Sequence, residues 1–215
     1  MKENEIMENI YPIKTGSLML SVYSYLYKAE DGYILFDAGM NTKAAQSVIM
    51  ELGIEPADVA AVFLTHTDLD HVGALPLFPE AEIFMAESNK AFLGTEAGRE
   101  RSKNFADMGF AYKTMNDGET VTAAGADVQC IFAPGHTPGS ASYLADNRYL
   151  FVGDNIGLKG GKATLFTPRY NMDGETQALS IRKQASFPWI ADIEAVFTAH
   201  YGHSKDPARA FEDWH

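Results

Sequence analysis

The sequence predicts a layered α/β protein, and three observations lead to this fold class. Short apolar runs with the length of strands recur along the chain, and amphipathic segments typical of helices separate some of them. Several of the apolar runs end directly at a histidine or an aspartate. The chain is also 46% hydrophobic over 215 residues, which is enough for a sizeable core.

In the first half, residues 17–37 alternate in polarity and predict two strands joined by a turn at 30–32. A helix should follow over 41–52, capped by Asn41, with one face formed by Ala44, Val48 and Leu52. The next predicted elements are a strand at 59–65, a helical turn within 72–78, a short strand at 82–86 and a polar, helical excursion over 87–105.

The second half repeats this pattern loosely. A helix is predicted over 176–187, with Leu179, Ile181 and Ala185 toward a core, and a short closing helix over 206–214. Residues 157–161 should form a loop. Strands are predicted near 110–115, 119–123, 126–133, 140–145 and 148–152, and the last one at 193–198.

Residues 66–71 place four potential metal ligands directly after the apolar run 59–64. In an extended segment, side chains two positions apart point the same way, so His66, Asp68 and Asp70 could face one cavity. His71 would turn in as the chain bends at Gly73. Such a cluster indicates a metal or catalytic site.

Three more potential ligands stand at or just after the ends of other apolar runs, namely His136, Asp154 and His200. Strand ends of a layered α/β protein deliver functional side chains to one rim, so these residues should join the 66–71 cluster. Seven ligands are too many for one tetrahedral ion. They suit two ions about 3.5–4 Å apart that share a bridging carboxylate.

The chain resembles the metallo-β-lactamase-fold hydrolases at landmarks that follow in the family's order over residues 33–200. They are Asp37-Ala-Gly39 at the end of a strand, the His-x-Asp-x-Asp-His motif at 66–71, the turn Pro134-Gly-His136-Thr-Pro-Gly-Ser140, Gly153-Asp154 and Ala199-His200. The resemblance implies a four-layer α/β/β/α sandwich with metals at one edge of its two sheets. It implies a first metal site of His66, Asp68 and His136, a second of Asp70, His71 and His200, and Asp154 as the bridge.

Asp68 departs from the family pattern, which usually has histidine at this position. We expect two divalent ions, zinc first, since zinc also accepts carboxylate ligands. Iron and manganese are the alternatives, because a carboxylate shifts the preference of the site toward harder ions. A short aspartate that reached the metal only through water would leave the first site weak or empty. We expect Asp70 and Asp154 to act most directly in catalysis.

Composition restricts the partners and the setting. The net charge of −12 argues against a nucleic-acid phosphate backbone as partner. The single cysteine, Cys130, excludes an internal disulfide framework. The N-terminus lacks the apolar core of a signal peptide and no run is long enough to span a bilayer, so we expect one cytoplasmic domain over residues 1–215. The sequence leaves open whether the protein forms a homodimer.

Several residues near the motifs have open roles. Asp37 should hold a ligand or the Asp70 region by hydrogen bonds. Tyr170, Tyr201 and His203 are further residues that could border the site. Lys159, Lys162 and Arg169 could bind a substrate carboxylate or phosphate, or could lie on a solvated loop.

The predicted function is metal-dependent hydrolysis of a small molecule, whose ester, lactone, thioester or phosphodiester bond is attacked by a metal-activated water. One alternative is a di-iron redox protein related to the flavodiiron oxygen or nitric oxide reductases. This alternative is suggested by Asp68, because that branch carries a carboxylate at the same position. The other alternative is a metal-containing sensor without turnover.

Overall fold

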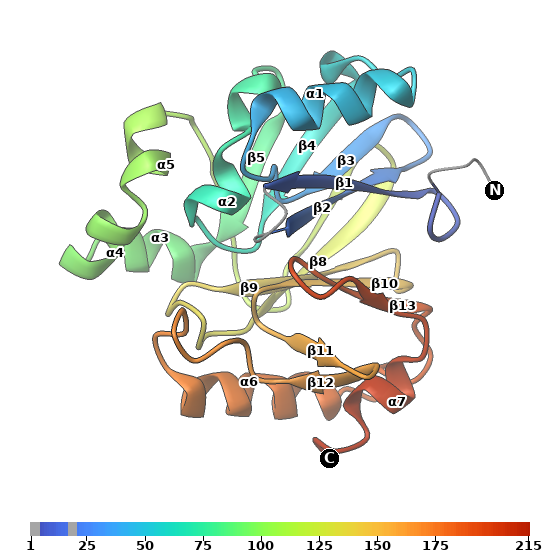
Figure 1. The fold of residues 1–215 in the computed structure, drawn as a ribbon, viewed down its shortest axis with the longest axis vertical. Coiled ribbons are helices and arrows are strands. Elements are labelled where there is room, and N and C mark those ends of the chain that lie inside the picture. Colours follow the sequence, from blue (N-terminus) through green and yellow to red (C-terminus); the bar gives the residue numbers. More distant parts are fainter. Residues whose placement is uncertain (1–4, 17–20) are drawn as a thin grey trace.

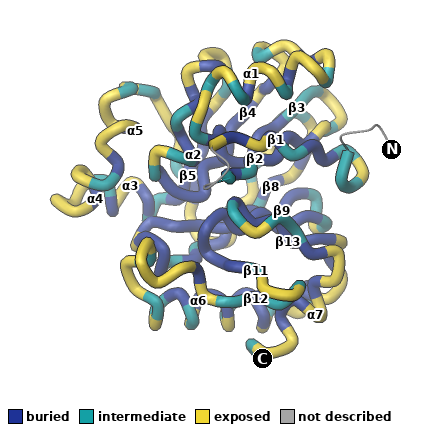
Figure 2. Tube along the Cα trace, in the orientation of Figure 1, coloured by how far each residue is buried: buried dark blue, intermediate teal, exposed yellow. Residues whose placement is uncertain are grey.

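The computed structural model describes residues 5–16 and 21–215. Two six-stranded sheets face each other, with helices on the outer side of each, and a small two-stranded sheet lies beside the second (Figure 1). Apart from β6 and β7, at one edge of each sheet, most strand residues are buried, whereas the outer helices alternate between buried and exposed residues (Figure 2).

The first sheet has the strand order β1-β2-β3-β4-β5-β6. β1, β2 and β3 pair antiparallel, whereas β3, β4, β5 and β6 pair parallel. The carboxyl ends of β3 and β4 therefore meet at one edge of this sheet. The strands are β1 (Ile10–Gly16), β2 (Ser21–Lys28), β3 (Tyr33–Phe36), β4 (Val59–Leu64), β5 (Glu82–Ala86) and β6 (Lys113–Met115).

The second sheet has the strand order β14-β13-β10-β9-β8-β7. β10 and β13 are parallel, and β9 runs antiparallel to both β8 and β10. The carboxyl ends of β8, β10 and β13 therefore share one edge. The strands are β7 (Thr120–Ala123), β8 (Ala126–Phe132), β9 (Ala141–Ala145), β10 (Tyr149–Gly153), β13 (Ala195–Thr198) and β14 (His203–Ser204).

Three apolar clusters show how the layers pack. The largest joins the inner faces of the two sheets and includes Phe36, Phe63 and Phe151. A second cluster joins the first sheet to α1 (Thr42–Glu51) and to the segment 72–78, which contains a 3-10 turn at Leu75–Leu77. A third joins the second sheet to α6 (Gly174–Ala185) and α7 (Pro207–Phe211). This is the predicted four-layer α/β/β/α sandwich.

Hydrogen bonds join the two sheets at the edge where these carboxyl ends meet. The backbone N–H of Tyr23 donates to the carbonyl of Ala199 at 2.8 Å. The Tyr143 hydroxyl donates to the carbonyl of Leu64 at 3.0 Å. The N–H of Ala141 donates to the carbonyl of Thr65 at 2.9 Å. These bonds fix the relative position of the loops that follow β4, β8, β10 and β13.

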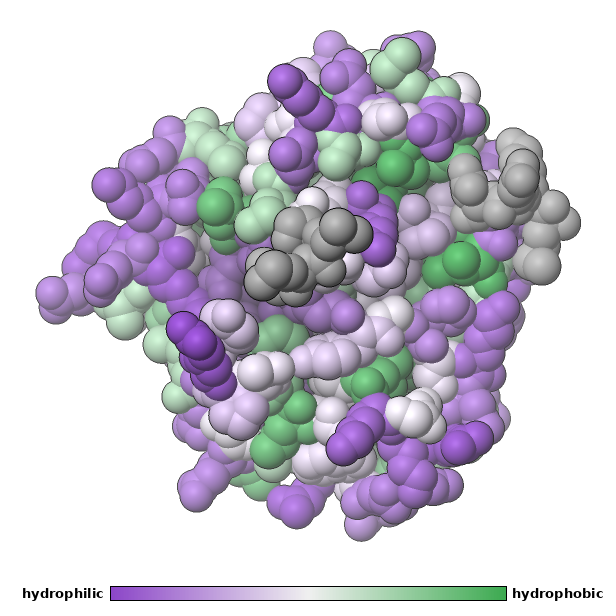
Figure 3. Space-filling view, in the orientation of Figure 1, coloured by the Kyte–Doolittle hydropathy of each residue, from purple (hydrophilic) through white to green (hydrophobic). Residues whose placement is uncertain are grey.

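The predicted excursion at 87–105 consists of three short helices, α3 (Glu87–Leu93), α4 (Glu96–Arg101) and α5 (Lys103–Met108), which project from the first sheet (Figure 1). The outer surface of this projection is mostly hydrophilic (Figure 3). A fourth short helix, α2 (Leu69–Val72), lies within the 66–71 cluster and was not predicted.

Other details differ from the sequence predictions. β1 was not predicted, and β14 follows the strand that was expected to be the last. Residues 157–161 are not a loop, because Gly157–Lys159 forms β11 and pairs with β12 (Lys162–Thr164). Leu179 is 63% exposed, and the buried face of α6 includes the polar residues Gln177 and Gln184 together with Ile181 and Ala185. In α1 the fully buried residues are Ala45 and Ile49, while Val48 and Leu52 of the predicted face are partly buried and pack against the same core.

The predicted cap of α1 is confirmed, because the Asn41 side chain accepts a hydrogen bond from the N–H of Ala44. Among the described residues, no helix is long and apolar enough to cross a membrane.

Candidate metal centre

Six potential ligands from four loops gather where the two sheets meet. Their ligand atoms form two groups, and within each group all atoms lie within 4.8 Å of one another. The first group is His66, His136 and Asp154, and the second is Asp70, His71 and His200. The structure therefore brings together residues as far apart in sequence as 66 and 200.

Asp154 lies between the two groups. Its Oδ2 is 3.5 Å from Nε2 of His136 and 3.6 Å from Nε2 of His71, while its Oδ1 is 3.3 Å from Nε2 of His200. One carboxylate thus faces imidazoles of both groups, which is the arrangement that a bridging ligand of a two-metal site needs.

Unsatisfied buried atoms show that these groups fit metal ions. Nε2 of His66, Nε2 of His71 and Oδ1 of Asp154 are buried and have no hydrogen-bond partner. Burying polar atoms without a partner is unfavourable, so such a cluster requires an explanation. Imidazole nitrogen and carboxylate oxygen are ordinary ligands of zinc and other divalent cations. Bound cations would satisfy all three atoms.

Asp37, which directly follows β3, orients one of the imidazoles. Its carboxylate accepts hydrogen bonds at 2.8 Å from the Thr65 N–H, from the Thr65 hydroxyl and from Nδ1 of His71. The bond to Nδ1 leaves Nε2 of His71 without a proton in the neutral ring, facing the metal position. Asp37 itself has a positive φ of 56°, a conformation that is strained for a residue other than glycine.

His200 is oriented in a similar way by the backbone. Its Nδ1 donates to the carbonyl of Ser21 at 2.8 Å, so its Nε2 points toward Asp70 and Asp154. The loop that carries Asp154 requires glycine at position 153, where φ is +55° and an added Cβ would lie 2.3 Å from Oγ1 of Thr65. The backbone of this loop can approach Thr65 only because Gly153 has no side chain.

The carboxylates of the cluster stay ionised and therefore favour positive charge next to them. Burial acts to raise the pKa of Asp154, but the surrounding histidines hold it well below its ordinary value. Burial acts to lower the pKa of His200, but Asp154 and Asp70 raise it to about 10. Burial also acts to lower the pKa of His71, and the neighbouring carboxylates raise it well above its usual value. Without metal, protons on these imidazoles therefore balance the carboxylates.

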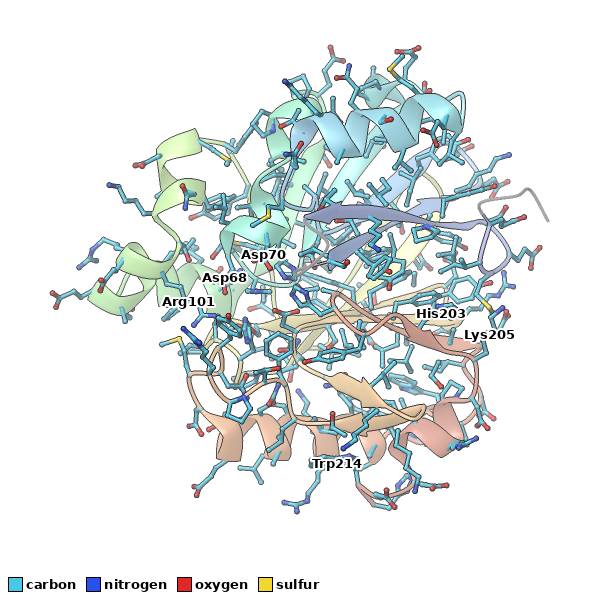
Figure 4. The ribbon with its side chains drawn as sticks, viewed as in Figure 1. Asp68, Asp70, Arg101, His203, Lys205 and Trp214 are labelled. Carbon is cyan, nitrogen blue, oxygen red and sulfur yellow. The ribbon has the colours of Figure 1, made fainter. Side chains whose placement is uncertain are left out.

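Asp68 has a different partner. Its two carboxylate oxygens accept hydrogen bonds from Nε of Arg101 at 2.7 and 3.0 Å, and Nη2 of Arg101 also donates to Oδ2. Oδ2 of Asp68 is 3.5 Å from Nε2 of His66 and 3.3 Å from Nε2 of His136. Figure 4 shows Asp68, Asp70 and Arg101 together on the same side of the molecule.

Arg101 was missed by the sequence reasoning. It ends α4, and no motif or spacing connects it to Asp68, 33 positions earlier. The basic residues that were considered instead lie elsewhere. Lys162 forms ion pairs with Glu212 and Asp213, and Lys159 and Arg169 do not line the cavity at the metal centre.

The cavity at the metal centre is small, about 190 Å³, and apart from the ligands, Asp68 and Arg101 its lining side chains are apolar or aromatic. Tyr170 lines it, as the sequence suggested it could. Tyr201 lies outside the lining and bonds through its hydroxyl to Thr167. His203 stacks on Phe197 and lies away from Asp68, Asp70 and Arg101 (Figure 4). The lining residues are Met40, Asp68, Leu69, Asp70, Arg101, His136, Asp154, Phe166, Tyr170 and His200.

Residues 19–188 match the family described as the metallo-beta-lactamase superfamily, and the chain belongs to this family. It is 30% identical over 175 residues to a hydroxyacylglutathione hydrolase of Synechococcus sp. (strain JA-3-3Ab), covering 78% of this chain and 63% of that protein. It is 29% identical over 156 residues to a probable polyketide biosynthesis zinc-dependent hydrolase of Bacillus velezensis, covering 70% of this chain and 62% of the relative. The chain thus spans slightly less than two thirds of these relatives.

Solved structures show the same fold. A metallo-beta-lactamase family protein from Thermus thermophilus superimposes with a TM-score of 0.70 at 22% identity, covering 97% of this chain and 79% of the other. The four-layer fold predicted from the resemblance is therefore confirmed by the strand order, by the packing and by this similarity.

Proposed function

We propose that this protein is a metal-dependent hydrolase that cleaves an ester, lactone, thioester or phosphodiester bond of a small molecule. The observation that carries the proposal is the pair of ligand groups that share Asp154, with their buried, unpartnered imidazole nitrogens. The hydrolase names of the curated relatives support it, and one of those names includes zinc. We propose zinc as the metal and two positions for it, one at each ligand group.

When bound, two divalent cations would lower the pKa of a shared water and polarise the bond to be cut. The chain's own residues prepare this chemistry. Asp154 faces both positions, and Asp37 and the Ser21 carbonyl hold His71 and His200 by Nδ1, so that Nε2 of each ring faces inward. Asp70 lies 3.4 Å from His200 through Oδ2 and completes the second group.

The cavity limits the substrate. Its small volume favours a small molecule or the end of a larger one, and its apolar wall suits an acyl or alkyl group next to the bond to be cut. Among the four bond types, the name of the Synechococcus relative favours an acyl thioester such as an acylglutathione. We propose the thioester as the first substrate class to test.

The test is an assay of zinc-loaded protein against matched esters, lactones, thioesters and phosphodiesters. Asp70→Asn should lower kcat/KM by about 10²-fold or more, because it weakens the metal that activates the water. Asp192→Asn is the matched control, since Asp192 is exposed and lies outside the site. Inactivity of fully loaded wild-type protein on the whole panel would contradict the proposal.

A further inference from the structure

We propose that Arg101 makes the two metal positions unequal, because it competes with the cation at the His66–His136–Asp154 group. The protein would bind one divalent cation tightly at Asp70, His71 and His200, and a second only when the Arg101–Asp68 pair opens. This inference rests on the metal centre of the proposed function but not on its substrate.

The competition concerns one nitrogen. Nη2 of Arg101 lies 3.1 Å from Nε2 of His136, the ring nitrogen that also faces Oδ2 of Asp154 at 3.5 Å. The same His136 Nε2 also lies 3.3 Å from Oδ2 of Asp68, so this ring nitrogen is enclosed by the Arg101–Asp68 pair. A cation that bound Nε2 of His136 would have to take the place of the guanidinium beside it. A metal at the first position therefore requires the guanidinium to move away.

Charge acts in the same direction. The guanidinium neutralises Asp68 through a bidentate pair, which is the strongest form of this interaction. Asp68 is thereby occupied by a fixed positive charge, and a divalent cation nearby would be repelled by that charge. Where the family usually supplies a third imidazole, this chain has an aspartate and the arginine that binds it.

Arg101 is held in place by the fold rather than by the Asp68 pair alone. Its Nη2 also donates to the carbonyl of Tyr170 at 3.2 Å. The next residue, Ser102, is buried and its hydroxyl lies 2.7 Å from the hydroxyl of Thr67, the neighbour of Asp68. The junction of α4 and α5 is thus bonded to the segment that carries the ligands. Opening the pair must break these contacts or rotate the arginine side chain out.

The second group has no such competitor. Within residues 5–16 and 21–215, neither Asp70 nor Asp154 forms an ion pair with a lysine or an arginine. His71 and His200 are oriented by bonds at Nδ1, which leave Nε2 available. This group can accept a cation by releasing protons, without moving an arginine.

The experiment is a titration of metal-free protein with zinc against a chromophoric chelator, with the stoichiometry checked by elemental analysis. Wild-type protein should bind one equivalent tightly and a second at least about tenfold more weakly. Arg101→Gln should strengthen the second step by about tenfold or more. Arg99→Gln is the control, because Arg99 is in the same helix and bonds only to the Gly94 carbonyl; it should leave both steps unchanged.

A wild-type measurement keeps the proposal testable if Arg101→Gln does not fold. In ¹H–¹⁵N spectra of the wild-type protein, the Nε–H signal of Arg101, assigned by through-bond correlation to its backbone resonances, should shift mainly with the second equivalent of zinc. Two equal binding steps, an unchanged second step in Arg101→Gln, or an Arg101 signal that shifts with the first equivalent would each overturn the inference. The hydrolase proposal can fail separately, since stepwise metal binding without turnover would leave the Arg101 inference intact.

Discussion

Replacing Asp37 with asparagine tests how the second ligand group is oriented. The Asp37 carboxylate accepts three hydrogen bonds, two from Thr65 and one from Nδ1 of His71. Asparagine has nearly the same shape and tolerates the positive φ at this position, so the backbone should stay in place. Its amide, however, has only one oxygen and one NH2 group.

Either orientation of the new amide brings two donors together. If the NH2 group faces His71, it opposes the Nδ1–H of the ring and favours the tautomer that places a proton on Nε2, the metal-facing nitrogen. If it faces the other way, it opposes the N–H of Thr65. One unsatisfied buried donor costs about 1–3 kcal/mol, and the loss of an outer partner of a metal ligand costs about 10–100-fold in metal affinity.

The assay compares Asp37→Asn with Asp192→Asn, an exposed position, in denaturant unfolding with and without zinc. We expect the zinc-bound Asp37 variant to lose about 1–3 kcal/mol of unfolding free energy relative to wild type. The control should change by less than about 0.5 kcal/mol. Unchanged stability together with unchanged zinc affinity would refute the role assigned to Asp37.

Three further predictions concern the backbone, the protons and the metal. Gly153→Ala should destabilise the protein by about 2–5 kcal/mol in chemical unfolding, because its Cβ adds a clash with Thr65 to the strain of a positive φ. Gly118→Ala, also at positive φ but with nothing within 4 Å, should cost only about 1–2 kcal/mol, and equal losses would contradict the steric argument. Zinc binding should release protons and tighten as pH rises from 6 toward 10, because His200 has a pKa of about 10 in the metal-free protein and must lose its proton to bind. Calorimetry in buffers of different ionisation enthalpy measures the number of protons released. Absence of proton release at pH 7 would contradict this prediction. Chelation should abolish hydrolysis and lower the thermal midpoint, since a ligand at about 100 times its Kd stabilises by about 2.7 kcal/mol; a midpoint insensitive to chelator would argue against bound metal.

Much of the site could be predicted from sequence because its residues stand at the ends of strands. Strand ends are recognisable locally, from an apolar run that stops at a polar residue, as at His66 and His200. The parallel pairing of β3 with β4 and of β10 with β13 then brings these ends to one edge. The local sequence pattern therefore locates the ligands at strand ends, and the sheet topology places those ends together.

Arg101 could not be predicted in this way. Its contact with Asp68 depends on how three short helices fold back over the edge of the first sheet, and this is a property of tertiary packing. The opposite error concerns Lys162, which follows Asp154 closely in sequence. The hairpin of β11 and β12 carries it toward α7, where it pairs with acidic residues. Lys162 is thus close to Asp154 in sequence but lies outside the site, whereas Arg101 is far from Asp68 in sequence and contacts it.

The exposed face of α6 shows a third limit of sequence reasoning. Leu179 fits a helical core pattern with Ile181 and Ala185, yet it faces solvent. The buried face of α6 includes Gln177, whose amide NH2 donates to the carbonyls of Asp154 and Asn155. A glutamine that supports the metal-carrying loop thus occupies a position that periodicity assigns to an apolar residue.

We infer that separate loops form a divalent-metal centre at Asp70, His71 and His200, shared with Asp154. The most direct measurement is a zinc-edge anomalous difference map from crystals of the zinc-loaded protein. We expect a strong peak about 2.0–2.2 Å from Nε2 of His71, Nε2 of His200 and a carboxylate oxygen of Asp70. Zinc bound only at other surface residues, with this cluster still held by protons, would contradict it.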